Sequence, residues 1–284
     1  MKTFKTAFLL TALTLLLLFA GQAIAGRRGM TMALVFAVIM NGTAYFFSDK
    51  IALMSSGAQP ISREQSPRLY AVMERLSAKA NLPMPKLYMI PQPAPNAFAT
   101  GRNPSHASVA VTQGLMQLMD DDELEGVIAH ELSHVRNYDI LTSSIAATIA
   151  GAVTWIASMG RWAMIFGGWG GRDDNREGGG IAALLMLFLA PIAALLLQLG
   201  ISRQREYQAD ASGAKMVGHP YGLMRALEKL GAYNKRIPMD ISPSTSALCI
   251  VAPLNTRQFL TGLFSTHPPL EDRIARLREM SVTR

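Results

Sequence analysis

Four long uncharged segments constrain the fold of this chain more than any other feature of its sequence. A helix needs about 20 consecutive apolar residues to cross the hydrocarbon core of a bilayer, and each segment approaches that length. The sequence therefore predicts an integral membrane protein with about four transmembrane helices. The segments are residues 8–25, 30–47, 140–159 and 181–201.

The first of these segments also fits a different interpretation. Lys2 and Lys5 precede it and Ala23-Ile24-Ala25 ends it, which is the pattern of a cleavable signal peptide. The second segment follows after only residues 26–29, as the second arm of a tight helical hairpin would. We therefore expect residues 1–48 to form an uncleaved hairpin of two spans.

The composition agrees with a membrane protein and excludes several other classes. Half of the 284 residues are hydrophobic and only 17% are charged, which excludes an intrinsically disordered chain. The net charge of +7 fits basic residues beside cytoplasmic helix ends, so no nucleic-acid partner is needed to explain it. Cys249 is the single cysteine, which excludes an intramolecular disulfide and a cysteine-based zinc ribbon. Any metal must be held by His, Asp or Glu.

The four spans place two long segments of the chain on one side of the membrane. Residues 49–139 and 202–284 are expected to fold together as the two parts of one domain, while residues 140–201 form a second hairpin with an exposed loop. Five of the 27 Lys and Arg residues lie in the two loops on the opposite side, which leaves 22 on the side of the domain. By the positive-inside rule, that domain lies in the cytoplasm.

Residues 120–136 are predicted to form an amphipathic helix that carries a metal site. The helix opens on acidic residues, which complement the positive end of the helix dipole. It contains His130-Glu131-Leu132-Ser133-His134, the HExxH pattern, in which two histidines four residues apart project from one face toward one ion. Glu131 then lies beside the open metal position, where it can act as a general base. The alternative is a pair of solvated histidines.

A catalytic zinc has three protein ligands and one open position, so a third ligand must come from elsewhere. A carboxylate is favoured over a third histidine, because Asn137 and Ile140 occupy the positions that the longer HExxHxxGxxH pattern requires. Glu206 and Asp210 lie four residues apart on a helix that is predicted to follow the fourth span. We expect Glu206 to bind the metal and Asp210 to hold a ligand histidine. The alternative is a solvated helix face whose acids pair with neighbouring arginines.

The stretch Asn96-Ala97-Phe98 is predicted to form the edge strand of a small sheet. Residues 87–90 and 108–112 have the pattern of short strands, and the proline-rich residues 91–95 separate the stretch from the first of them. An edge strand can bind an extended substrate by adding it as another strand, which gives weak sequence specificity and requires unfolded polypeptide. A plain surface loop is the alternative.

These motifs together resemble the HtpX family of heat-shock membrane zinc proteases, within the larger family that includes the CAAX prenyl protease. The resemblance covers nearly the whole chain and is carried by residues 96–101, 130–139, 202–210 and 265–274. It implies an α+β, mainly helical fold with a gluzincin-like zinc protease domain, a small β-sheet and one Zn²⁺ per chain.

The resemblance also implies roles for residues that the metal motif does not reach. Asn96, Ala97 and Phe98 would form the strand that binds substrate. His267 would help to stabilise the transition state, with Arg273 orienting nearby. A histidine that simply precedes a final helix, residues 270–279, is the alternative for His267.

The sequence thus predicts a membrane-bound zinc endopeptidase in which Glu131 is the general base for a water molecule activated at the metal. The resemblance implies a bacterial inner-membrane location, contact with the lipid bilayer, and misfolded or damaged membrane proteins as substrates in stress-linked quality control. A membrane metal-binding or transport protein without hydrolytic activity is the alternative, but the four segments contain no His, Asp or Glu to line a conduction path. Prenyl-peptide processing is a second alternative, for which four spans would be few.

Overall fold

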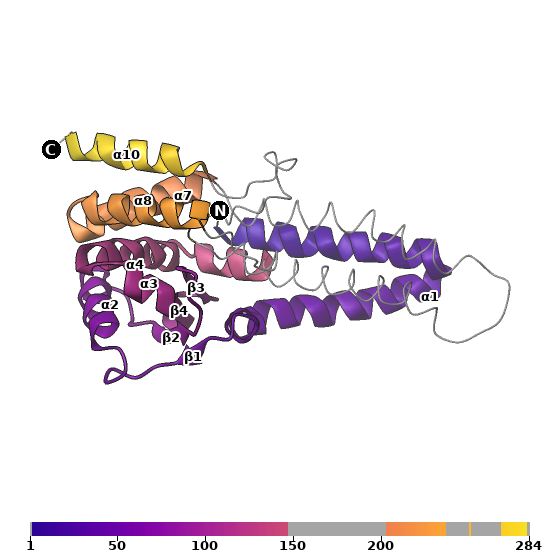
Figure 1. Cartoon of the computed structure of the whole chain (residues 1–284). Coiled ribbons are helices and arrows are strands. Elements are labelled where there is room, and N and C mark those ends of the chain that lie inside the picture. Colours follow the sequence, from indigo (N-terminus) through magenta and orange to yellow (C-terminus); the bar gives the residue numbers. More distant parts are fainter. Residues whose placement is uncertain (1, 147–202, 237–249, 251–267, 283–284) are drawn as a thin grey trace.

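The computed structural model describes residues 2–146, 203–236, 250 and 268–282 (Figure 1). The described part is mainly helical with one small mixed sheet, as the sequence predicts. The predicted fourth span, the loop before it, His267 and most of the third span fall outside the described residues, although residues 139–146 are helical. In chain order, the described elements are α1 (Lys2–Ser55), β1 (Gln59–Pro60), α2 (Pro67–Ala80), β2 (Lys86–Ile90), β3 (Ala97–Gly101), η1 (Pro104–His106), β4 (Ala107–Thr112), α3 (Gln113–Leu118), α4 (Asp121–Arg136), α7 (Arg203–Val217), α8 (Tyr221–Arg236) and α10 (Leu270–Val282).

Helix α1 turns back on itself at Gly26 and forms a hairpin. A straight helix would separate Thr14 from Asn41 by about 40 Å, since each residue adds about 1.5 Å. Instead, Nδ2 of Asn41 donates a hydrogen bond to Oγ1 of Thr14 at 2.8 Å. The chain reverses at Gly26, whose φ of 56° is a conformation that glycine adopts without a steric penalty. The two arms therefore lie side by side, as Figure 1 shows.

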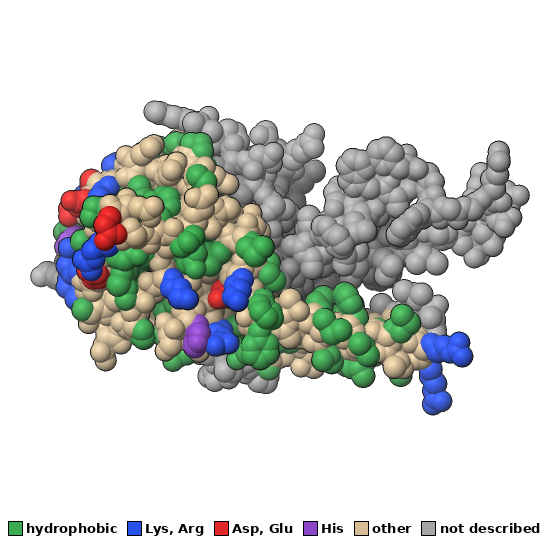
Figure 2. All heavy atoms as spheres, turned by 90° about the horizontal axis from the view of Figure 1, so that it is seen from below, with side chains coloured by type: hydrophobic (Ala, Val, Ile, Leu, Met, Phe, Trp, Pro, Cys, Tyr) green, Lys and Arg blue, Asp and Glu red, His purple; other side chains and the backbone are tan. Residues whose placement is uncertain are grey.

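The second arm of this hairpin exposes apolar side chains along most of its length. Met32, Val35, Val38, Ile39 and Phe46 are each more than half exposed. Figure 2 shows hydrophobic side chains along the hairpin and Lys or Arg side chains at its far end. Within the described residues, one segment, Gly26–Ser55, is long and apolar enough to cross a membrane. The total of four spans stays a prediction.

The small sheet joins the hairpin to the rest of the molecule. Its strand order is β1-β2-β4-β3; β2 and β4 are parallel, and the outer strands β1 and β3 are antiparallel to their neighbours. Phe98 of β3 packs against Ala52 and Leu53, near the end of α1. On the other face, β3 and β4 contribute Ala97, Ala99, Val109 and Val111 to the main core, to which α2 and α4 also contribute. The sheet is thus held between the end of the hairpin and α4.

Helix α4 is the centre of the domain. Its apolar side chains Leu124, Val127, Ile128, Leu132 and Val135 are fully buried, and they form the stripe that the sequence predicts. Helices α2, α7 and α8 pack around it, and α10 covers α7 and α8 (Figure 1). The backbone of α8 approaches α4 so closely at Gly126 that a side chain there would meet the backbone of Leu223. Helix α4 is therefore held firmly in place on several sides.

Candidate metal centre

The start of α4 is fixed by a capping box. Asp120 accepts a hydrogen bond from the Glu123 amide at 2.9 Å, and the Glu123 carboxylate accepts one from the Asp120 amide at 2.9 Å. Glu123 is 1% exposed and its charge is balanced by Lys229 of α8, at 2.6 Å. These interactions hold the first turn of α4, and the helical repeat then places His130 and His134 on one face.

Helix α7 brings the third predicted ligand to this face. A Cβ added to Gly213 would lie 3.0 Å from the amide nitrogen of His130, so the two helices are in direct backbone contact at this point. Glu206, two helical turns earlier on α7, lies beside both histidines. Its Oε2 atom is 3.6 Å from Nε2 of His130, and its Oε1 atom is 3.5 Å from Nε2 of His134. One donor atom from each of the three residues lies within 4.8 Å of the others.

The separations of these donor atoms fit a tetrahedral zinc ion. Zinc ligands at about 2.0–2.2 Å, at tetrahedral angles, are separated from one another by about 3.3–3.5 Å. The two Nε2 atoms are 3.2 Å apart, and their contacts with the Glu206 carboxylate are 3.5 and 3.6 Å. These two contacts use different carboxylate oxygens, so a small rotation of the carboxylate would present one oxygen to both. The residues therefore fit zinc with one corner left open.

The tautomers of the two histidines also favour a cation between them. Oδ1 of Asp210 lies 2.8 Å from Nδ1 of His130, and Oδ2 of Asp139 lies 3.5 Å from Nδ1 of His134. A carboxylate at this position favours the tautomer that carries its proton on Nδ1. In the neutral form of each ring, Nε2 then carries the lone pair, and the two Nε2 atoms lie beside each other and beside the Glu206 carboxylate. The two neutral rings and the Glu206 carboxylate would together offer three ligand atoms to one metal ion.

The electrostatic surroundings of His130 agree with this conclusion. Burial acts to lower the pKa of His130, but the carboxylates of Asp210 and Glu206 outweigh burial and raise the pKa to about 9. The site therefore stabilises a positive charge on the ring of His130, and a metal ion bound at Nε2 would take the place of the proton there.

Arg273 of α10 supports the site from behind Asp210. Its Nε and Nη2 atoms donate to the two carboxylate oxygens of Asp210 at 2.8 and 2.7 Å, and its Nη1 donates to the Ile250 carbonyl at 2.8 Å. The side chain of Arg273 is 1% exposed. Burial acts to raise the pKa of Asp210, but the guanidinium group outweighs it and holds that pKa below its usual value. Asp210 is therefore an anion locked between Arg273 and His130.

Asp139, which supports His134, was not assigned a role by the sequence. It follows Tyr138, whose φ of 62° lies in the left-handed region and reverses the chain at the end of α4. The reversal turns Asp139 back toward His134, and Arg205 of α7 pairs with the same carboxylate at 3.5 Å. A carboxylate just beyond an HExxH helix is the signal that could have identified it.

Glu131 lies between the histidines and β3. Its Oε2 atom accepts a hydrogen bond from the Ala99 amide at 2.8 Å, and the residue is 4% exposed. Burial raises the pKa of the Glu131 carboxyl. Glu131, the predicted general base, is thus buried beside the ligands and hydrogen-bonded to the main chain of the outer strand β3.

The predicted substrate stretch lies just before Ala99, whose main-chain amide is bonded to Glu131. Asn96 precedes β3, and its side-chain oxygen accepts a hydrogen bond from the Ile250 amide at 3.2 Å. The Phe98 side chain packs toward α1, on the opposite face of the sheet from Glu131. Ala97 and Ala99 are small and buried. His267 lies outside the described residues, so its position relative to the ligands stays a prediction.

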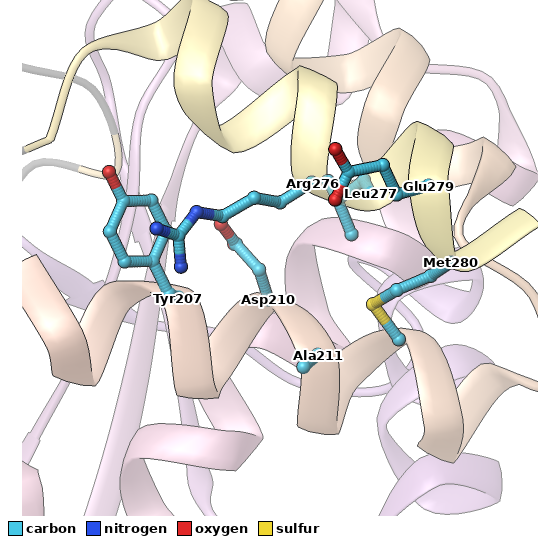
Figure 3. A pocket seen from close by; sticks show the side chains of 7 residues that line it. All are labelled: Tyr207, Asp210, Ala211, Arg276, Leu277, Glu279 and Met280. Carbon is cyan, nitrogen blue, oxygen red and sulfur yellow. The ribbon is translucent and has the colours of Figure 1, made fainter.

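A cavity of about 370 Å³ lies beside Asp210, between α7 and α10 (Figure 3). Arg276 lies across the ring of Tyr207, with 3.7 Å between the guanidinium carbon and the ring centroid. Arg276 therefore does not share the role of Arg273, although both residues belong to α10. The cavity is lined by Tyr207, Asp210, Ala211, Arg276, Leu277, Glu279 and Met280.

Comparison with known proteins agrees with this geometry. The model of peptidase family M48 matches residues 63–281. The chain is 58% identical to a protease HtpX homolog of Desulfatibacillum aliphaticivorans, over 96% of this chain and 88% of that protein. It is 53% identical to a protease HtpX homolog of Desulforapulum autotrophicum, over 98% of this chain and 89% of that protein.

A likeness in fold extends to a solved structure. The crystal structure of S. mikatae Ste24p matches 97% of this chain and 64% of its own chain, with a TM-score of 0.54 and 21% sequence identity. The chain thus spans less than two thirds of Ste24p, and at this identity the likeness concerns the fold alone. The family match, the HtpX relatives and the His-His-Glu cluster agree with one another. The chain therefore belongs to peptidase family M48 and is a membrane metalloprotease.

Proposed function

We propose that the chain is a zinc endopeptidase of the bacterial inner membrane that cleaves misfolded or damaged membrane proteins in stress-linked quality control. The observation that carries the proposal is the meeting of His130, His134 and Glu206 at separations that suit tetrahedral zinc, with the carboxylate of Glu131 beside them. One zinc per chain is proposed because the three ligands belong to one chain.

Glu131 would move the protons of the reaction. When bound, zinc supplies Lewis-acid catalysis and makes a water molecule acidic enough to lose its proton near neutral pH. Glu131 would accept that proton and return it to the amine that leaves when the peptide bond breaks. Its burial suits this exchange, because a raised pKa brings the carboxyl closer to the working pH.

The substrate would bind as an extended strand along β3. Asn96, Ala97 and Phe98 lie at the outer strand of the sheet, and Ala99 of the same strand is bonded to Glu131. Main-chain pairing selects unfolded polypeptide over a particular sequence. We also propose that His267 helps to stabilise the transition state; its neighbours Pro268 and Pro269 lead into α10, which carries Arg273 to the site.

The proposed topology keeps four spans, with residues 49–139 and 202–284 as two parts of one cytoplasmic domain and residues 140–201 as the second membrane hairpin. It is supported by the close packing of α4 and α7, which come from the two parts. A site at the bilayer surface would meet the unfolded loops of neighbouring membrane proteins, and no nucleic-acid partner is proposed.

The test compares the detergent-purified wild type with Glu131→Gln. Both proteins are assayed for bound zinc, and for cleavage of an unfolded protein before and after a chelator is added. We expect each to bind one zinc per chain and only the wild type to cleave, because the substituted amide leaves the ligands in place and cannot accept a proton. If both bind zinc and neither cleaves, the alternative of a metal-binding or transport protein is favoured instead.

A further inference from the structure

The hydrogen bonds of β3 alternate between the sheet and its outer edge. The Thr112 amide donates to the Asn96 carbonyl at 2.9 Å, so Asn96 faces β4. Ala97 is paired in register with Val111, next along the ladder, and Ala99 is paired with Val109. In an antiparallel pair the bonded and non-bonded positions alternate. The main-chain groups of Ala97 and Ala99 therefore point away from β4, toward the outer edge.

These two outward positions differ in one respect. The Ala99 amide donates to Oε2 of Glu131 at 2.8 Å. Within the described parts of the chain, the outward amide and carbonyl of Ala97 make no hydrogen bond. Ala97 is fully buried, so an added strand could use its outward groups only once they are exposed. The Ala99 amide, by contrast, is already occupied by Glu131.

We propose that the hydrogen bond from Ala99 to Glu131 sets the register in which substrate is cleaved and holds Glu131 in position for proton transfer. The inference rests on the proposed peptidase function and on substrate pairing with β3. Ala99 acts here as a positioning residue through its amide, because the reacting atoms are met by Glu131.

The register follows because a substrate carbonyl and the Glu131 carboxylate compete for one hydrogen-bond donor, the Ala99 amide. A strand added to β3 would pair with the amide and carbonyl of Ala97 and with the carbonyl of Ala99. Whichever way that strand runs, one of its carbonyls would ordinarily accept the Ala99 amide, but Glu131 already does so. That substrate carbonyl is left without a partner in the ladder, directly beside Glu131 and the metal ligands. It is the carbonyl that the site can attack, so the scissile bond is the one at this position.

The same hydrogen bond orients the base. A main-chain amide bonded to Oε2 restrains the position of the carboxylate and leaves Oε1 to accept the proton. Because β3 is held by β4 and by the contact of Phe98 with α1, the amide that restrains Glu131 is itself rigid. The binding strand and the base therefore move as one unit.

Substrate binding to two inactive variants tests the competition. In Glu131→Gln the side-chain oxygen still accepts the Ala99 amide, whereas Glu131→Ala frees that amide for the substrate. Both variants are uncharged at this position and cannot turn over. With a fluorescent unfolded casein as the probe, we expect Glu131→Ala to bind about fivefold more tightly than Glu131→Gln. This factor corresponds to the net free energy of one main-chain hydrogen bond. Equal affinity in the two variants would overturn the inference.

Backbone esters test the positioning role in the active protein. Replacing Ala99 by lactic acid removes its N–H and keeps the side chain, and the same replacement at Ala97 is the matched control. At Ala99 we expect kcat to fall about tenfold or more with KM unchanged, since the lost bond orients Glu131 and does not bind substrate. At Ala97 we expect KM to rise about fivefold with kcat unchanged.

Zinc content confirms that each ester variant retains a folded site. An Ala99 ester that raises KM as the Ala97 ester does would overturn the inference, because the substrate would then be using the Ala99 amide. The binding comparison needs neither ester nor turnover. A wild type that binds zinc and unfolded casein but cuts nothing would therefore count against the proposed function, and the two Glu131 variants would still decide the competition for Ala99.

Discussion

Replacing Arg273 by leucine should damage both the stability of the domain and its metal affinity. Arg273 donates two hydrogen bonds to Asp210 at 2.8 and 2.7 Å, and the Asp210 side chain is 5% exposed. Removing the guanidinium leaves a buried carboxylate whose remaining partner among the described residues is His130. Breaking one side of a buried ion pair costs about 3–5 kcal/mol. Because Asp210 orients His130, zinc affinity should also fall about 10- to 100-fold.

Arg276→Leu is the matched control for this change. It removes the same side chain from the same helix, three residues further along, where Arg276 is exposed and stacks on Tyr207 (Figure 3). Its loss should cost about 0.5–1 kcal/mol and leave zinc affinity unchanged.

The assay uses full-length protein in detergent. Thermal unfolding is followed without metal at one scan rate, and zinc affinity is measured by competition with a chelator. Adding Asp210→Asn to Arg273→Leu should recover part of the stability, because no unpaired charge stays buried, and should not recover the metal affinity. Equal effects of Arg273→Leu and Arg276→Leu on both measurements would refute this role of Arg273, and so would a double variant that is less stable than the two single effects added together.

Three further predictions concern the supports of the site. Asp139→Asn should weaken zinc binding severalfold in chelator competition, less than Asp210→Asn does, because its contact with His134 is 3.5 Å long and partly exposed; an equal or larger loss would contradict this ranking. Gly213→Ala should lower the free energy of unfolding by about 1–3 kcal/mol and weaken zinc binding, because its Cβ would push α7 away from α4; unchanged affinity would show that the helices adjust. Asp120→Ala should cost about 1 kcal/mol of unfolding free energy at neutral pH with no change in zinc affinity. The hydrogen bond from the Glu123 amide holds the pKa of Asp120 below its ordinary 3.8, so the contribution of the cap is complete above that pH and the difference from wild type should shrink as the pH falls below it.

The two histidine ligands could be predicted because their positions depend only on the repeat of one helix. His130 and His134 are four residues apart, and any helix through them places both on one face. Glu206 lies far away in the sequence, yet the demand of zinc for a third ligand and the spacing to Asp210 were enough to select it. The apolar stripe of α4 followed from periodicity. Strands β2, β3 and β4 were predicted from their residues, whereas β1, which has only two residues, was not.

The contacts that hold Glu131, His134 and α7 in place could not be predicted so directly. The bond from Ala99 to Glu131 uses a main-chain amide, which every residue but proline possesses, so no sequence pattern marks it. Asp139 reaches His134 only because Tyr138 adopts a left-handed conformation that a tyrosine rarely adopts. Gly213 has no special mark in the sequence, and its importance comes from the backbone of α4 that lies against it. Each of these features depends on tertiary packing.

The direct passage of α1 into the sheet would set the distance between the sheet and the membrane in the proposed topology. α1 ends at Ser55 and β1 begins at Gln59, so no flexible tether separates the anchor from the domain. The 30 residues of Gly26–Ser55 measure about 45 Å as a helix, against about 30 Å for the hydrocarbon core. In the proposed orientation the end of α1, which turns out of line with the rest of the arm in Figure 1, would project from the bilayer and carry β3 near its surface. A loop of a neighbouring membrane protein would then have to extend that far from the bilayer before its sequence could influence cleavage.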